Sequence, residues 1–401
     1  MEDYVDVNDP ISIKFQGIEM RGINDSQSFL RYHPNMEEEE IDSKIGVPVK
    51  VYIQRGTKTN ALVTFHDIGT NHISFLSFFN YPEMRVILEN FTVYHICAPG
   101  HQNSPRSINN EPPHAENFQL LSGRTSSSES ASDPFTSSRE SLKQRTFLNY
   151  PTMAELADIV ADVVDHFQLK FFIGFGMGAG SNVLTRYGLL YPNKLLGLFL
   201  INPNDTTTGY YPWTRAIWSD IPYLKSGVAT DWLQNWLLDH WFGACTERNM
   251  DLEQSYLQLV DELNPVAVAG YIESYMNRTA LGLIRPINSL ETNATTLKVD
   301  SFLVAGEMST DLARAMVEMN GNLDPSKTQF ISIPDATGAV IDELPSKVAT
   351  LFLSYLRNIG ILVTLTPEKL HKAAIERQIE QAKLMSVNET FQMNYESVDK
   401  C

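Results

Sequence analysis

The segment with the clearest chemical potential is an apolar run that leads directly into a glycine-rich turn, Phe171–Gly180. A strand that enters such a turn and continues as a helix is the setting of the G-x-S-x-G nucleophile elbow, in which small flanking residues let strand and helix approach closely around a strained serine. We place the tip of this turn at Gly176, and glycine offers no hydroxyl, thiol or carboxylate for attack. The neighbouring Met177 is a thioether, and Ser181 lies well into the following helix, where we expect a packing role. The sequence therefore predicts an elbow without a nucleophile.

The acid and the base of a hydrolytic triad are sought after the last two strands, because they follow the nucleophile in that order in this arrangement. The late strand Val304–Gly306 is followed by Glu307 and Asp311, either of which stands where an acid belongs. After the final strand, hydrolases often carry Gly-His, whereas this chain has Gly-Ala, ending at Ala339. Two of the three triad positions therefore lack the required chemistry. Loss of triad members leaves about 10³–10⁴-fold catalysis over water, which is small beside a working enzyme.

A third segment, His66-Asp67-Ile68-Gly69, follows the strand that usually precedes the oxyanion-hole loop. We expect its four residues, together with Met177, to form the edge of a pocket. Asp67 is a poor neighbour for an oxyanion because like charges repel. An acid–base pair of His66 and Asp67 is one alternative; we favour a structural role in which both side chains bond local backbone.

The same turn also fits a second motif. Gly174, Gly176 and Ala179 match the G-x-G-x-x-G/A fingerprint of dinucleotide-binding turns, and Asp205, after the next strand, could bind a ribose. We disfavour this alternative because at least three strands precede the turn, and a lone fingerprint is a weak signal.

A regular alternation of strand-like and helix-like segments must position these residues. It predicts an α/β fold with a mainly parallel sheet flanked by helices, and we expect the α/β-hydrolase architecture over residues 42–360. Residues 205–290 hold helix-like patterns and all five tryptophans, which indicates a small helical cap inserted over the sheet. The expected strands are apolar runs that end at turn residues: Val47–Gln54, Ala61–Phe65, Phe91–Ala98, Phe171–Ile173, Leu195–Ile201, Val299–Gly306 and Gln329–Ile333.

Three segments flank or interrupt this domain. Residues 1–41 form an acidic N-terminal extension, whose Glu37–Glu40 run we interpret as part of a solvated tail. Residues 361–401 contain the helix-start pattern Thr366-Pro367-Glu368, which predicts a C-terminal helix followed by a polar tail. We favour docking of this helix on the domain, with docking on a partner as the alternative. Residues 101–148 are Ser-rich and too poor in apolar side chains to offset their ordering entropy, so we expect a flexible insertion. It carries the candidate phosphorylation sites Ser126, Ser127, Ser130 and Ser137.

Composition limits the partners and the compartment. A formal net charge of −17 disfavours phosphate backbones, so we expect no nucleic-acid partner. The N-terminus lacks a basic n-region and an apolar h-region, and no apolar run is long enough to span a bilayer. We therefore expect a cytoplasmic protein without an integral membrane segment. Cys97, Cys245 and Cys401 are odd in number and widely spaced, which favours neither a disulfide framework nor a zinc site, and we expect no metal and no cofactor.

Several segments in order resemble the N-myc downstream-regulated (NDRG) family. The resemblance covers roughly residues 45–360 apart from the Ser-rich insertion. It implies an α/β-hydrolase-like domain with a small cap, no hydrolytic activity, and a cytoplasmic role in signalling, stress response, growth or differentiation. Family members carry a kinase-modified Ser/Thr-rich C-terminal region, whereas the Ser-rich stretch of this chain is internal. The matching segments are Thr64–Asn71, Asn90–Gly100, Ile173–Tyr187, Tyr191–Pro192, Leu198–Pro203 and Tyr275–Arg278.

The sequence thus favours a non-enzymatic binding or adaptor protein that works with protein partners. Two alternatives stay open. One is a hydrolase whose catalytic residues have been relocated to the region of His66, Asp67 and Glu307. The other is a sensor that keeps a pocket for a small molecule or lipid without the chemistry.

Overall fold

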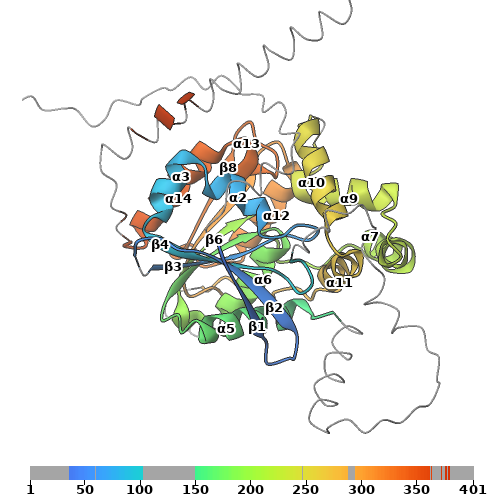
Figure 1. The fold of residues 1–401 in the computed structure, drawn as a ribbon, viewed down its shortest axis with the longest axis horizontal. Coiled ribbons are helices and arrows are strands. Elements are labelled where there is room, and N and C mark those ends of the chain that lie inside the picture. Colours follow the sequence, from blue (N-terminus) through green and yellow to red (C-terminus); the bar gives the residue numbers. More distant parts are fainter. Residues whose placement is uncertain are drawn as a thin grey trace, which may run out of the picture.

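The computed structural model describes residues 36–58, 60–102, 150–245, 247–287, 294–361 and 363, together with 372, 375, 376, 378 and 379. Within these ranges one eight-stranded sheet has the order β1-β2-β4-β3-β5-β6-β7-β8 (Figure 1). β1 and β2 pair antiparallel with each other, and β2 pairs antiparallel with β4, whereas all later neighbours are parallel. The prediction of a mainly parallel α/β fold is confirmed. The strands are β1 (Glu37–Asp42), β2 (Pro48–Gln54), β3 (Asn60–Phe65), β4 (Phe91–Ile96), β5 (Phe172–Met177), β6 (Leu195–Ile201), β7 (Asp300–Gly306) and β8 (Thr328–Ile333).

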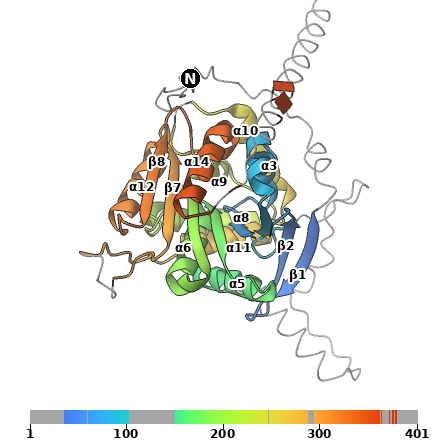
Figure 2. The same cartoon turned by 90° about the vertical axis from the view of Figure 1, so that its left-hand side faces the viewer.

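Helices cover both faces of this sheet, and Figure 2 shows β1 and β2 at one edge and β8 at the other. One face carries α5 (Met153–His166), α6 (Ala179–Leu190) and α12 (Thr310–Gly321), and the other carries α2 (Ile73–Phe79), α3 (Pro82–Leu88), α13 (Val340–Glu343) and α14 (Pro345–Asn358). The strand side chains alternate between the two apolar cores beneath these helices. In β6, Leu198 and Leu200 join the first core, while Phe199 and Ile201 join the second.

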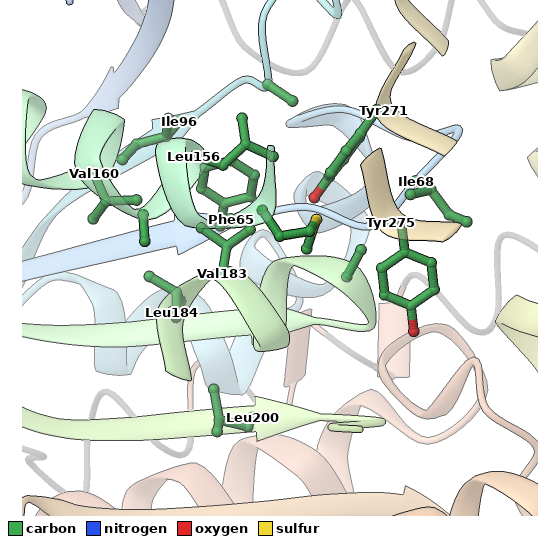
Figure 3. Close-up of a cluster of buried hydrophobic side chains, with 14 of the residues drawn as sticks. Phe65, Ile68, Ile96, Leu156, Val160, Val183, Leu184, Leu200, Tyr271 and Tyr275 are labelled. Atoms are coloured by element: carbon green, nitrogen blue, oxygen red, sulfur yellow. The ribbon is translucent and has the colours of Figure 1, made fainter. Parts of the chain in front are cut away.

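The first core extends from the sheet through α5 and α6 to the cap (Figure 3). α5 begins at Thr152 with a complete capping box, because Thr152 Oγ1 accepts from the Glu155 amide and the Glu155 carboxylate accepts from the Thr152 amide. Leu156 and Val160 of this helix are buried in the same core as Phe65 of β3.

β5 departs from the alternating pattern on one side only. Ile173, Phe175 and Met177 enter the second core. On the other side only Phe172 joins the first core, because the next two positions are Gly174 and Gly176. A Cβ at Gly174 would lie 2.6 Å from Leu198 Cδ2, and a Cβ at Gly176 would lie 2.7 Å from the Cα of Ser181. The two glycines therefore let α6 pack directly on the strand backbone.

A helical cap lies between β6 and β7 and gathers on one side of the domain in Figure 1. No helix in the described ranges is long and apolar enough to cross a membrane. The cap consists of α7 (Tyr210–Arg215), the π-helical turn η4 (Ala216–Asp220), α8 (Ile221–Lys225), α9 (Asp231–Phe242), α10 (Met250–Glu262) and α11 (Pro265–Met276).

The structure describes parts of both segments that flank the domain. The Glu37–Glu40 run is not a solvated tail: it forms most of β1, whose ladder to β2 is reinforced by ion pairs from Arg55 to Glu37 and from Lys50 to Glu38. Of the C-terminal helix only separate residues are described, and Glu376 among them pairs with Arg85 of α3. The start of that helix at Thr366–Glu368 and the four candidate phosphorylation sites, Ser126, Ser127, Ser130 and Ser137, lie outside the described residues.

Candidate functional site

The turn between β5 and α6 has its tip at Gly178, and the assignment of the tip to Gly176 is corrected. Gly176 lies inside β5, paired with Phe65 and Leu200, and is small because α6 packs against it. Gly178 has φ 49° and ψ −113°, a combination that is strained for residues with a side chain and typical of functional turns. Gly176 and Gly180 are thus the two outer glycines of the G-x-S-x-G pattern, and Gly178 takes the place of its serine. The tip still lacks a nucleophile.

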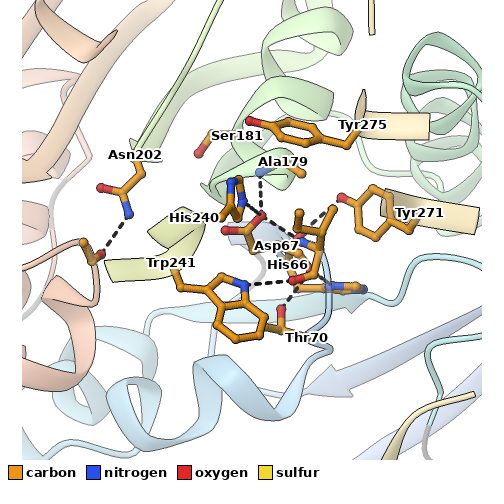
Figure 4. A network of polar contacts seen from close by, with 12 residues as sticks. His66, Asp67, Thr70, Ala179, Ser181, Asn202, His240, Trp241, Tyr271 and Tyr275 are labelled. Carbon is orange, nitrogen blue, oxygen red and sulfur yellow. Dashed lines mark hydrogen bonds and ion pairs between the residues drawn. The ribbon is translucent and has the colours of Figure 1, made fainter. Parts of the chain in front are cut away.

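The space above this tip is filled by Asp67, which follows β3. A Cβ built on Gly178 would lie 1.9 Å from Asp67 Oδ2 and 2.3 Å from its Cγ. Asp67 Oδ1 accepts hydrogen bonds from the backbone amides of Ile68 and Ala179, both at 2.8 Å (Figure 4). These are the two amides that form an oxyanion hole in this fold, one from the loop after β3 and one from the residue after the nucleophile. A carboxylate of the chain itself therefore occupies both the oxyanion hole and the volume of a nucleophilic side chain.

The local electrostatics favour a negative charge at this position. Asp67 lies at the N-terminus of α6, where free amides and the helix dipole stabilise an anion. His240 of α9 adds a third contact, with Nε2 2.8 Å from Asp67 Oδ1. The side chains of Asp67 and His240 are only 5% and 10% exposed, so solvent screens this contact weakly. The same carboxylate would repel an oxyanion, as the sequence predicted.

α9 closes the site from the cap side. Trp241 Nε1 donates to the Ile68 carbonyl at 2.9 Å, and the indole ring covers Gly69, whose Cβ would lie 2.8 Å from Trp241 Cζ2. Gly69 has φ 67°, so a side chain there would be strained as well as crowded. The predicted pocket edge at Ile68 and Gly69 is therefore covered by the cap. Met177 is buried in the second core, away from any open surface.

His66 does not pair with the carboxylate of Asp67. Its Nδ1 bonds the Asp67 carbonyl and its Nε2 accepts from the Ala98 amide, both at 2.8 Å, so the ring is a neutral bridge between two backbone segments. Burial lowers the pKa of His66 to about 3, and the nearby His101 contributes to this shift. The acid–base alternative built on His66 and Asp67 is therefore wrong, and the structural role expected for His66 is confirmed.

The positions named for the acid and the base do not converge on this centre. Glu307 is exposed after β7, and Asp311 Oδ1 accepts from the Ala244 amide beyond the end of α9. Ala339 is buried at the start of α13, and the preceding Gly338 donates its amide to the Phe242 carbonyl at 2.9 Å. The end of α9 is thus packed where a catalytic imidazole would need room. Asp205, the ribose ligand of the dinucleotide alternative, accepts from Asn322 near α12 instead.

Sequence reasoning missed three participants: Gly178, His240 and Trp241. For Gly178 a signal was present, because Gly176-x-Gly178-x-Gly180 also fits the elbow pattern. For His240 and Trp241 there was none, because both lie 173 residues from their partners in the loop after β3.

The strand order, the turn at Gly178 and the loop after β3 define an α/β-hydrolase-fold protein. Solved structures agree: the chain superposes on a thermophilic esterase from Thermogutta terrifontis with a TM-score of 0.57 at 15% identity, covering 80% of this chain and 99% of the esterase. A putative alpha/beta hydrolase from Nostoc gives a TM-score of 0.54 at 15% identity, covering 80% and 98%. At this identity the likeness concerns the fold alone.

The sequence comparisons identify the family. The profile of the Ndr family matches residues 38–118 and 139–363, and the chain belongs to this family. The chain is 30% identical to "Protein NDRG3" of Xenopus tropicalis over 331 residues, which cover 81% of this chain and 74% of that protein. It is 31% identical to "Protein NDRG3" of Xenopus laevis, over 81% of this chain and 76% of that protein, and 30% identical to "Protein NDRG1-A" of Xenopus laevis, over 81% and 72%.

Proposed function

We propose that this chain is a non-catalytic α/β-hydrolase-fold protein that acts by binding, as a cytoplasmic signalling or adaptor protein. The observation that carries the proposal is the carboxylate of Asp67 on the Ile68 and Ala179 amides. Family resemblance adds the expected setting of signal transduction, stress response, growth and differentiation. The high net negative charge supports protein partners over nucleic acid.

Three separate losses support the absence of hydrolysis. Gly178 provides no nucleophile. Near Ala339, the backbone at the end of α9 occupies the space that the side chain of a catalytic base would need. The oxyanion hole, whose donors are each worth about 10²–10³-fold in kcat, is occupied by Asp67. All three groups act together in the transition state of acyl transfer, so restoring one group alone would not restore turnover.

A relocated hydrolase remains a second candidate because Asp67 and His240 form a carboxylate–imidazole pair. The pair is supported less well, since Asp67 Oδ1 already accepts from two amides and Trp241 covers the loop above them. A sensor of small molecules or lipids is compatible with the main proposal. We also propose that the folded domain runs from β1, at Glu37, to residue 360, rather than from residue 42. Residues 101–148 and 205–290 are its insertion and cap, and the insertion carries regulatory phosphorylation.

The test uses the purified full chain with a fluorophosphonate probe and a panel of esters of different acyl length. We expect no active-site labelling and no turnover, with the Thermogutta esterase as the positive control. An Asp67→Asn variant serves as the matched control, because it keeps the shape of the side chain and removes its charge. Turnover by the wild-type chain that disappears in Asp67→Asn would establish the relocated hydrolase instead and overturn the proposal.

The adaptor role is tested by affinity purification from cytosol with the wild-type chain and with a chain lacking residues 101–148. We expect a reproducible set of protein partners, part of which depends on the insertion. Recovery of no partner by either chain would contradict an adaptor role.

A further inference from the structure

A shallow surface pocket lies where the cap meets α6, and its lining shares no residue with the network around Asp67. It has a volume of about 310 Å³. Its walls come from the loop after β6, from α7 and from the end of α11. They are formed by Thr207, Thr208, Trp213, Met276, Asn277 and Arg278.

The charge in this pocket comes from Arg278, which is only 7% exposed. Its Nε donates to the Thr206 carbonyl, and its Nη1 donates to Thr208 Oγ1 and to the Tyr275 carbonyl. Its guanidinium also lies 3.9 Å from the centre of the Tyr275 ring. All these partners are neutral, so within the described chain the buried charge has no carboxylate. Burying a cation without a counter-ion is unfavourable.

A second guanidinium increases this excess of positive charge. Arg186 of α6 is half-buried and bonds Asn182 Oδ1 and both oxygens of Thr279, again without a carboxylate among the described residues. Burial lowers the pKa of Arg186, and repulsion from Arg278 lowers it further, so the two guanidinium groups interact electrostatically. Carboxylates are not scarce, because the chain has 48 acidic residues. Other arginines form ion pairs with them, including Arg55, Arg85, Arg215 and Arg248.

The neutral groups of the pocket are mostly donors. Trp213 Nε1 can only donate, so the atom of Asn277 that it bonds at 2.8 Å is the carbonyl oxygen. The amide nitrogen of Asn277 and the Nη2 of Arg278 make no hydrogen bond within the described part of the chain. The hydroxyl of Thr207 adds a third donor at the exposed rim. These donors beside the buried guanidinium of Arg278 favour an anionic acceptor.

We propose that this pocket binds the phosphate group of a phosphomonoester. A phosphomonoester carries a charge of about −1.5 to −2 at neutral pH. It is therefore a stronger counter-charge for Arg278 than a carboxylate, and Arg186 adds positive potential from outside the pocket lining. Its three terminal oxygens accept from the fork of an arginine and from neighbouring donors together. The volume exceeds that of a phosphate ion, and Met276 and the Trp213 ring offer apolar wall for the organic part of the ligand. The proposal is independent of whether the Asp67 centre is catalytic.

The decisive experiment introduces a carboxylate at the rim. Thr207→Glu places an anion beside Arg278, and Thr207→Gln is its neutral control of equal shape; Thr207 is exposed, so both variants are expected to fold. Isothermal titration calorimetry on the full chain uses inorganic phosphate, glycerol 3-phosphate and acetate, with sodium chloride at matched ionic strength. Thermal unfolding is recorded with and without each anion.

We expect saturable binding of both phosphates by the wild type and by Thr207→Gln. In Thr207→Glu we expect binding to be at least roughly tenfold weaker, and the melting temperature without ligand to be higher than in Thr207→Gln. Acetate that binds as tightly as phosphate would overturn the phosphate assignment. Equal phosphate binding by the Glu and Gln variants, or none by the wild type, would overturn the site itself.

Sedimentation with phosphatidylcholine vesicles, with and without phosphatidic acid, identifies the source of the phosphate. Sedimentation that requires phosphatidic acid and is lost in Thr207→Glu assigns the site to a lipid headgroup. Binding of glycerol 3-phosphate without such sedimentation assigns it to a soluble ester.

Discussion

The conflict between a side chain at position 178 and the carboxylate of Asp67 gives the sharpest prediction, and it concerns Gly178→Ala. The new Cβ would lie 1.9 Å from Asp67 Oδ2, so the carboxylate must move away. It would then weaken up to three charge-assisted contacts, to the Ile68 amide, the Ala179 amide and His240. Such bonds contribute about 1.5–3 kcal/mol each, and the positive φ adds about 1–3 kcal/mol of backbone strain. With partial relaxation, we expect a loss of about 3–6 kcal/mol in the free energy of unfolding.

The assay is a double-mutant cycle, with urea unfolding of the wild type, Gly178→Ala, Asp67→Ala and the double variant. In the Asp67→Ala background the clash is absent, so Gly178→Ala should cost only the strain of about 1–3 kcal/mol. Gly282→Ala is the matched control, because Gly282 has φ 62° and nothing within 4 Å of its ideal Cβ. Effects of the two substitutions that add to within about 0.5 kcal/mol would refute the contact between Asp67 and Gly178 as we describe it.

Two further predictions follow from buried histidines and from the insertion. Burial lowers the pKa values of His66 and His101 to about 3 and about 4, below the value of about 6.5 in the unfolded chain. Their contribution to the free energy of unfolding is therefore complete above about pH 6.5, and the free energy of unfolding falls as the pH decreases toward 4. Urea unfolding across this range should show a flatter pH dependence in His101→Phe, and an unchanged slope would contradict the assignment. The rings of His101 and Tyr150, on either side of the insertion, lie 6.4 Å apart, so replacing residues 103–149 by a short Gly/Ser linker should leave the melting temperature within a few degrees of the wild type. A large drop measured by calorimetry would mean that the insertion contributes to the core.

The strands could be predicted from the sequence because burial on a parallel sheet leaves a local signal. The apolar runs of β3 and β6 end at turn residues, and both strands lie where the pattern placed them. β5 was predicted too short: it was expected to end at Ile173 and continues to Met177. The β1 strand was not predicted because it is an edge strand whose glutamates face solvent, so its composition carries no apolar strand pattern. Its backbone hydrogen bonds to β2 hold it in the sheet.

The tip of the elbow was misplaced by one repeat for a physical reason. Gly174, Gly176, Gly178 and Gly180 alternate, so two overlapping frames fit the motif. Gly174 and Gly176 are small because α6 packs on them, whereas Gly178 is small because Asp67 lies above it. The position at which β5 ends decides which glycine is the tip of the turn, and composition defines strand ends poorly. The contacts of His240 and Trp241 with the loop after β3 are tertiary and leave no local pattern.

The proposed absence of hydrolysis gives the arrangement around Asp67 a simple physical interpretation. An oxyanion hole attracts any acceptor, and here the acceptor is attached to the same chain. The competition is unequal because Asp67 is a charged acceptor that the fold holds in place, whereas an ester carbonyl is a neutral acceptor that must bind from solution. The donors that would have stabilised a transition state instead satisfy a buried carboxylate and, through His240, tie the cap to the sheet. A serine at position 178 would clash with the Asp67 carboxylate and would face an oxyanion hole that this carboxylate already occupies. Gly178→Ser alone should therefore remain inactive, and Asp67→Gly is the change that must come first.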